Sequence, residues 1–168
     1  NGGGDFTPMF LAPAPACLAF SFYRHLPVLK KNLIPVLAGS AVGAGVSMGS
    51  VYLLCRLFRL DEEMTASLLP KSVTTPIAMG VSEQLGGIVP ITVAAVVFTG
   101  ILGAIFAPLM IKIFRVRSPI AAGLAIGACS HAVGTSKAVE LGEVEGAMSG
   151  IAIGTVGLVT VLLGMVLS

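Results

Sequence analysis

The chain has 168 residues, of which 55% are hydrophobic and 11% are charged, and its mean hydropathy is +0.98. A soluble domain carries about 25% charged residues, so this composition excludes an ordinary water-soluble enzyme or nucleic-acid binder. The net charge of +2 is too small to indicate a polyanionic partner such as nucleic acid. The length fits one domain over residues 1–168.

Five long uncharged stretches predict a membrane protein. A helix needs about 20 mostly apolar residues to cross the hydrocarbon core of a bilayer, and the five stretches are 18 to 28 residues long. The period-2 alternation of outer-membrane barrels is absent. We therefore expect an all-α polytopic membrane protein. The stretches are residues 6–23, 32–55, 84–111, 118–136 and 146–168.

Four segments are predicted to be transmembrane helices. They run over about Phe6–Phe22, Leu33–Leu54, Ile88–Ile111 and Gly146–Ser168. The second is rich in glycine and serine, and small residues let helix backbones approach closely. We expect this helix to pack against other helices rather than against lipid.

Two further segments, 64–87 and 118–145, are apolar but interrupted. In the first, Pro70 and Pro76 enclose a polar run, and proline both removes a backbone donor and clashes with the preceding turn. The second begins near Pro119 and becomes polar from Ser130 to Lys137. Broken backbone at membrane depth must be buried in protein or line a wet cavity, because lipid offers no hydrogen bonds.

The basic loops predict that both interrupted segments are re-entrant. The loops at 24–31 and 112–117 carry most of the Lys and Arg residues, and such loops lie in the cytoplasm. The two basic loops lie on the same side of the membrane only if the segment 64–87 enters and leaves the membrane on one face. By the same reasoning, the segment 118–145 enters and leaves from the cytoplasmic face. This arrangement is an inverted repeat, and at an offset of 60 residues Thr75 matches Thr135 and Glu83 matches Glu143.

The first interrupted segment contains a candidate anion site. Lys71 is followed by hydroxyl residues at Ser72, Thr74 and Thr75. A lysine at membrane depth is costly unless it is paired or hydrated, which marks it as functional; the alternative is a lysine that extends to the interface. An ammonium group, hydroxyl donors and the N-terminus of a half-helix all favour a carboxylate.

The second interrupted segment contains Ser130, His131 and Thr135, which we expect to complete the same site. A histidine changes charge near neutral pH and suits a proton-coupled step, although a lone histidine is often a packed, hydrogen-bonded residue. Glu83 and Glu143 are candidates for coupling, with interfacial solvation as the alternative. Lys137 is predicted to be an interfacial anchor.

The sequence predicts neither a metal site nor a catalytic site. Cys17, Cys55 and Cys129 have no metal-ligand spacing, and we interpret them as buried thiols. No nucleotide-binding, hydrolase or metalloprotease motif is present. We therefore expect no cofactor, no metal and no enzymatic activity.

The two polar motifs resemble those of the LrgB/CidB family of bacterial membrane proteins. The resemblance starts near Phe10 and covers most of the chain. It is carried by Leu69–Met79, by Arg117–Ala121 and Ser130–Thr135, and by Gly100–Ala104 and Glu145–Ala147. Family members usually begin with further transmembrane helices, so we expect this sequence to be truncated at its N-terminus. The chain also has Ala12-Pro13 where the family has Gly-Pro, and Ser21-Phe22-Tyr23 where it has Pro-Leu-Tyr.

The resemblance implies two functions. Bacterial members are named antiholin-like proteins, which are proposed to regulate murein hydrolase export and cell lysis with a small LrgA/CidA-type partner. A plastid relative translocates glycolate and glycerate, and some bacterial members are implicated in pyruvate uptake. We predict a multi-pass carrier of small monocarboxylates in the bacterial inner membrane, a homo-oligomer with no nucleic-acid partner; the alternative is an antiholin-like regulator.

Overall fold

A computed structural model describes residue 30 and residues 32–167, and this part of the chain forms helices joined by short loops. The predicted helix at 6–22 lies outside the described residues. The helices are α4 (Leu33–Leu57), α5 (Glu62–Leu68), α6 (Thr75–Gln84), α7 (Val89–Ile113), α8 (Pro119–Leu141) and α9 (Glu143–Leu167). The all-α prediction is confirmed for this region, which contains no strand.

Three of these helices, α4, α7 and α9, are long and apolar enough to cross a membrane. Each has 24 or 25 residues in its candidate span, which corresponds to about 36 Å of helix. The predicted spans at 33–54, 88–111 and 146–168 coincide with them. Large apolar side chains are exposed on all three helices, among them Val42, Ile105 and Leu158, as expected where the neighbour is lipid rather than water.

The first interrupted segment is a helical hairpin made of α5 and α6. Its two helices are joined by a turn over residues 69–74. The return of the chain is fixed by Ser67, whose Oγ accepts the backbone N–H of Ile88 at 2.6 Å. Pro70 lies in the turn, whereas Pro76 lies in the first turn of α6, where proline is tolerated.

The second interrupted segment, α8, is also folded back on itself. His131 breaks the helix with φ 41° and ψ −139°, so each half is about a dozen residues long. Pro119 at the start of α8 and Leu141 at its end line the same surface pocket. A straight helix of 23 residues would separate these residues by about 33 Å. The segment is therefore a second helical hairpin with its tip at Ser130–His131.

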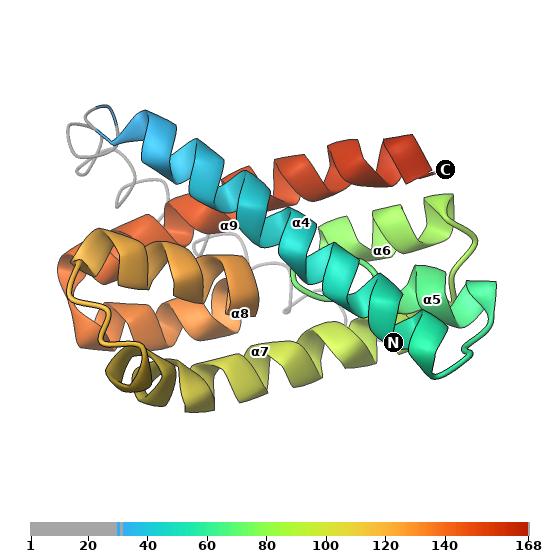
Figure 1. The fold of residues 1–168 in the computed structure, drawn as a ribbon, viewed down its shortest axis with the longest axis horizontal. Helices are drawn as coiled ribbons and strands as arrows, with labels where there is room; N and C mark the ends of the chain where they lie inside the picture. Colours follow the sequence, from blue (N-terminus) through green and yellow to red (C-terminus); the bar gives the residue numbers. More distant parts are fainter. Residues whose placement is uncertain (1–29, 31, 168) are drawn as a thin grey trace, which may run out of the picture.

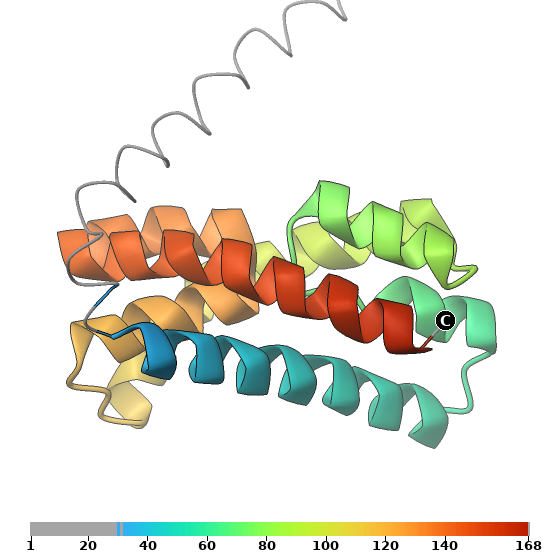
Figure 2. The same cartoon turned by 90° about the horizontal axis from the view of Figure 1, so that it is seen from above.

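The two hairpins approach each other from opposite ends of α7. The first is joined to the N-terminus of α7 and the second to its C-terminus. Figure 1 shows α5 and α6 at one end of the molecule and α8 at the other, and Figure 2 shows the same arrangement from above. One buried cluster joins Val73 from the first tip with Ala128 from the second, together with Ala44, Val96 and Val156. The tips therefore meet near the middle of the bundle.

Helix α9 supports the second hairpin at very short range. A Cβ added at Gly127 of α8 would lie 2.8 Å from the Cβ of Ala152 in α9, and one at Gly123 would lie 2.9 Å from that of Met148. Only glycine permits this approach. Among the three candidate spans α9 is the most buried, at 44% of its most apolar window compared with 17% for α7.

The prediction that the glycine-rich helix at 33–54 packs against other helices is only partly correct. Ser40 in α4 forms a hydrogen bond of 2.7 Å with Thr155 in α9, and Gly43 faces Ala128 of α8. Gly39, Gly45 and Gly49 have no neighbour within 4 Å among the described residues. Gly45 and Gly49 lie on the open face of α4, because a step of two residues from Gly43 turns the helix by about 200°.

Replacing Gly127 with leucine should destabilise the protein, because the new side chain would overlap α9. We expect a loss of about 1–3 kcal/mol, measured as a lower thermal unfolding midpoint by circular dichroism in detergent. Gly45→Leu is the matched control, since it lies on the open face of α4 and should gain up to about 1 kcal/mol from helix propensity. Equal midpoints for the two variants would contradict the close packing of α8 and α9.

Candidate functional site

The tip of the first hairpin holds Lys71 and Ser72 against α4. The half-buried Lys71 donates a hydrogen bond from Nζ to Ser72 Oγ at 3.3 Å. Ser72 is buried, and its Oγ lies 2.6 Å from the Oγ of Ser47 in α4. The turn also bonds internally, with the N–H of Val73 donating to Pro70 O at 3.3 Å. The Ser72 hydroxyl and the backbone of the turn are therefore bonded inside the protein, whereas the Lys71 ammonium has a neutral hydroxyl as its acceptor.

The tip of the second hairpin is fixed to α7 and α9. His131 is 4% exposed, and its Nε2 lies 2.9 Å from the carbonyl oxygen of Val96 in α7. A carbonyl can only accept, so Nε2 carries the proton. Thr135 donates from Oγ1 to His131 O at 2.9 Å, which ties the residue at the break to the next turn, and it accepts from Ser149 of α9 at 2.7 Å.

Two glycines of α7 make room for this tip. A Cβ added at Gly100 would lie 2.6 Å from Cε1 of His131, and one added at Gly103 would lie 2.5 Å from Cβ of Ser130. Both distances are shorter than real Cβ contacts. Since the two glycines are three residues apart, they share one face of α7. The tip of the second hairpin packs against this face.

The two tips are close in space. Lys71 and Cys129 are within electrostatic range of each other, and Cys129 directly precedes Ser130 at the second tip. The interpretation of Cys129 as a buried thiol is wrong, because its side chain is exposed, whereas Cys55 is buried as expected. No carboxylate among the described residues forms an ion pair with Lys71, whereas Lys137 is paired with Glu140. The meeting point of the hairpins therefore contains a cation with no carboxylate beside it.

Some of the predicted site residues lie where the two hairpin tips meet, and others lie farther away. Lys71, Ser72, Ser130, His131 and Thr135 belong to the tips or to their immediate supports. Thr74 and Thr75 are half-buried at the start of α6, and the Thr74 side chain does not cap that helix.

The two predicted coupling carboxylates lie elsewhere. Glu83 is exposed near the end of α6, about 12 Å of helix away from Thr75. Glu143 is exposed at the start of α9, at the base of the second hairpin. The structure thus brings neither carboxylate to the tips. Lys137 is held by its ion pair with Glu140 in the returning half of α8.

Three residues of the site were not among the sequence predictions. Ser47 was one of many small residues in a glycine-rich helix, with no local signal that it faces Ser72. Ser149 and Val96 contribute a hydroxyl and a backbone carbonyl to the second tip, and only the tertiary fold brings them there. Among the described residues no group of three His, Cys, Asp or Glu side chains is placed to hold a metal ion.

The sequence is similar to that of known bacterial membrane proteins. The sequence model of the LrgB-like family matches residues 1–168. The antiholin-like protein LrgB of Bacillus mycoides is 41% identical over 162 residues, which is 96% of this chain and 70% of the relative. The protein of the same name from Bacillus subtilis is 40% identical over the same shares, and the B. subtilis protein YwbG is 41% identical over 150 residues, 89% of this chain and 66% of the relative. No solved structure matches the chain.

A disulfide between positions 47 and 72 tests whether the first tip lies against α4. With the three native cysteines replaced by alanine, Ser47→Cys/Ser72→Cys should form a disulfide on mild oxidation, since the two hydroxyl oxygens are 2.6 Å apart and an S–S bond spans about 2.05 Å. The linked peptides are detected by mass spectrometry. Gly49→Cys/Ser72→Cys is the control from the open face of α4, and equal linkage in both pairs would contradict the contact.

Proposed function

The chain belongs to the LrgB-like family, and on that premise we propose that it is a multi-pass protein of the bacterial inner membrane that carries small monocarboxylates of the pyruvate, glycolate or glycerate class. The observation that supports this most is the position of Lys71. A half-buried ammonium group that has no carboxylate partner among residues 32–167, at the meeting point of two hairpin tips, favours an anionic ligand.

The proposed binding site draws on both tips. The carboxylate binds to the Lys71 ammonium, with hydroxyl groups and the N-terminus of α6 as further donors. The second tip closes the site from the opposite side. The hydroxyl residues assigned to the site are Ser72, Thr74 and Thr75 on the first hairpin and Ser130 and Thr135 on the second.

We assign proton coupling to His131. Its Nε2–H is engaged with Val96 O, which leaves Nδ1 as the ring position that can take up a proton. Glu83 and Glu143, which are exposed and lie away from the tips, are less suited to coupling than His131. The mechanism requires no cofactor and no covalent step.

The arrangement of the hairpins fits an inverted repeat. Lys71 and His131 are 60 positions apart, and each lies at the tip of a hairpin that follows a long apolar helix. In transporters built from such repeats, the substrate lies between interrupted helices near the bilayer midplane, and rocking of one repeat against the other alternates access. In this proposal both segments are re-entrant and the basic loops are cytoplasmic.

A second function is favoured by the names of the relatives, two of which are called antiholin-like protein LrgB. In that case the chain regulates murein hydrolase export and cell lysis, acting in oligomers and with a small LrgA/CidA-type membrane protein. The open glycine face of α4 is compatible with such assembly. The names support regulation more directly than transport, whereas the position of Lys71, with no described carboxylate beside it, supports transport.

Uptake into liposomes separates the two functions. With the full-length protein, with and without its small partner, labelled pyruvate and glycolate should enter saturably, and Lys71→Met should lower uptake at least about tenfold because a hydrogen bond to a charged group contributes about 1.5–3 kcal/mol. Lys137→Met, an ion-paired lysine away from the tips, is the control. Release of a large trapped dye without saturable uptake would favour the regulator.

A glutamine at position 131 tests proton coupling. The side-chain amide of His131→Gln can still donate to Val96 O, but it cannot titrate. We therefore expect the variant to fold and to take up pyruvate at one rate with and without a pH gradient, whereas the wild-type rate rises with an inward proton gradient. Unchanged acceleration by the gradient in His131→Gln would remove His131 from coupling.

A further inference from the structure

A hydrogen-bonded chain joins Lys71 to α4. The Lys71 ammonium donates from Nζ to Ser72 Oγ at 3.3 Å, and the same Oγ lies 2.6 Å from the Oγ of Ser47. An ammonium group has no lone pair, so Ser72 is the acceptor in the first bond. Ser47 lies 25 positions before Ser72, in a helix that is part of neither hairpin. Helix α4 therefore reaches the charged group of the site through Ser72.

Apolar side chains surround the two hydroxyls. Most of the lining of the small cavity at this pair is apolar, and its apolar members are at most 7% exposed. They include Ala44, Met48, Leu69, Val73 and Val156. A hydrogen bond in such surroundings is electrostatically stronger than one in water. Packing alone does not account for the pair, because two apolar groups of similar shape can replace two bonded hydroxyls at almost no cost in stability.

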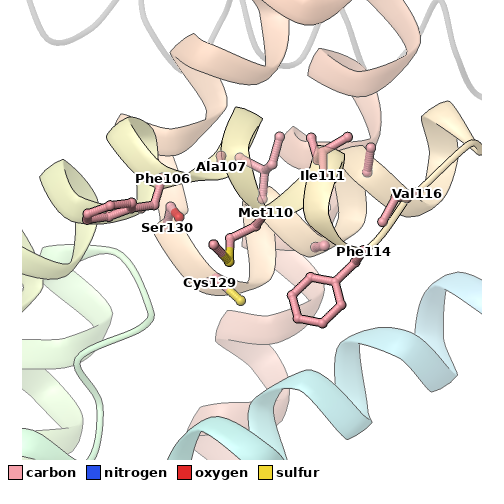
Figure 3. A pocket seen from close by; sticks show the side chains of 12 residues that line it. Phe106, Ala107, Met110, Ile111, Phe114, Val116, Cys129 and Ser130 are labelled. Atoms are coloured by element: carbon pink, nitrogen blue, oxygen red, sulfur yellow. The ribbon is translucent and has the colours of Figure 1, made fainter.

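The second hairpin tip has different surroundings. Ser130 borders an apolar pocket whose lining from α7 includes Phe106, Met110 and Phe114, and Figure 3 shows these side chains beside it. The hydroxyl that a neighbouring helix gives to the Lys71 chain comes instead from α4. Ser47 is thus the described contact by which a long helix can orient the ammonium group.

We propose that Ser47 is a positioning residue of the carboxylate site, which holds the Lys71 ammonium in its binding orientation through Ser72. This inference rests on the proposed function. The ammonium has three N–H donors, and its bond to Ser72 uses one of them. The other two are then available to a carboxylate in a fixed orientation. A lysine that is ordered in advance loses less side-chain entropy when the ligand binds.

Removal of the Ser47 hydroxyl should weaken binding without stopping transport. Ser72 would lose its partner in α4, and its hydroxyl could rotate among the staggered positions. The ammonium would then lose its fixed acceptor, and the cost of ordering it would oppose ligand binding. Since Ser47 acts through Ser72 rather than on the solute, the loss should fall on affinity and not on the maximal rate.

Uptake of labelled pyruvate into liposomes that contain the full-length protein measures this role. Ser47→Ala should raise the pyruvate concentration for half-maximal uptake about three- to tenfold, the range that corresponds to one hydrogen bond, and leave the maximal rate unchanged. Ser47→Thr keeps a hydroxyl at this position and should restore the wild-type value. Ser50→Ala is the matched control from the same helix, since the exposed Ser50 bonds within α4, to Ser47 O at 2.9 Å.

The outcomes separate this inference from the proposed function. An unchanged half-saturation concentration in Ser47→Ala, with uptake still lowered in Lys71→Met, would overturn the inference and leave the carrier proposal standing. A lower thermal unfolding midpoint and maximal rate at an unchanged half-saturation concentration would assign Ser47 to the fold alone and also overturn it, as would failure of Ser47→Thr to restore affinity. Saturable uptake that is absent or independent of Lys71 would overturn the carrier proposal, and this inference with it.

Discussion

Backbone that leaves helical hydrogen bonding at membrane depth must find its partners inside the protein, because lipid provides none. The two hairpin tips meet this requirement in different ways. The first bonds within its own turn and reaches α4 through the hydroxyls of Ser72 and Ser47. The second uses Thr135 to bond the carbonyl of His131, and α7 receives it at Gly100 and Gly103. When the polar groups at both breaks form these hydrogen bonds and contacts, the two tips lie together in the middle of the bundle.

Bringing the tips together also determines the chemistry of the centre. The long helices contribute mostly apolar side chains, so almost every polar group there comes from the tips and the hydroxyls that support them. Lys71 is the charged member, and its immediate hydrogen-bond acceptor is the neutral Ser72. Such a centre suits an anionic solute that arrives and leaves. A purely structural contact between hairpins would have no use for an ammonium group that has no carboxylate partner among residues 32–167.

The sequence predicted that both segments are interrupted and turn back, but not the residue at which the second one breaks or the contacts that hold each tip. Pro70, Pro76 and the basic loops marked the first hairpin, because proline and charge act locally. The second break occurs at His131, a residue type that does not itself end helices. It depends on room left by Gly100 and Gly103, about thirty positions earlier, and on Ser149 after it. The contact of Ser47 with Ser72 could not be predicted either, because the tertiary packing determines which small residues of α4 face the first hairpin.

Alkylation of Cys129 in the membrane tests most directly whether a carboxylate is held between the tips. Cys129 is exposed and lies in electrostatic range of Lys71. With Cys17 and Cys55 replaced by alanine, its rate of reaction with a maleimide reports occupancy of the centre. A carboxylate site there predicts saturable protection of Cys129 by pyruvate, and loss of this protection in Lys71→Met. An alkylation rate that is unchanged at every pyruvate concentration, or protection that persists without Lys71, would contradict it.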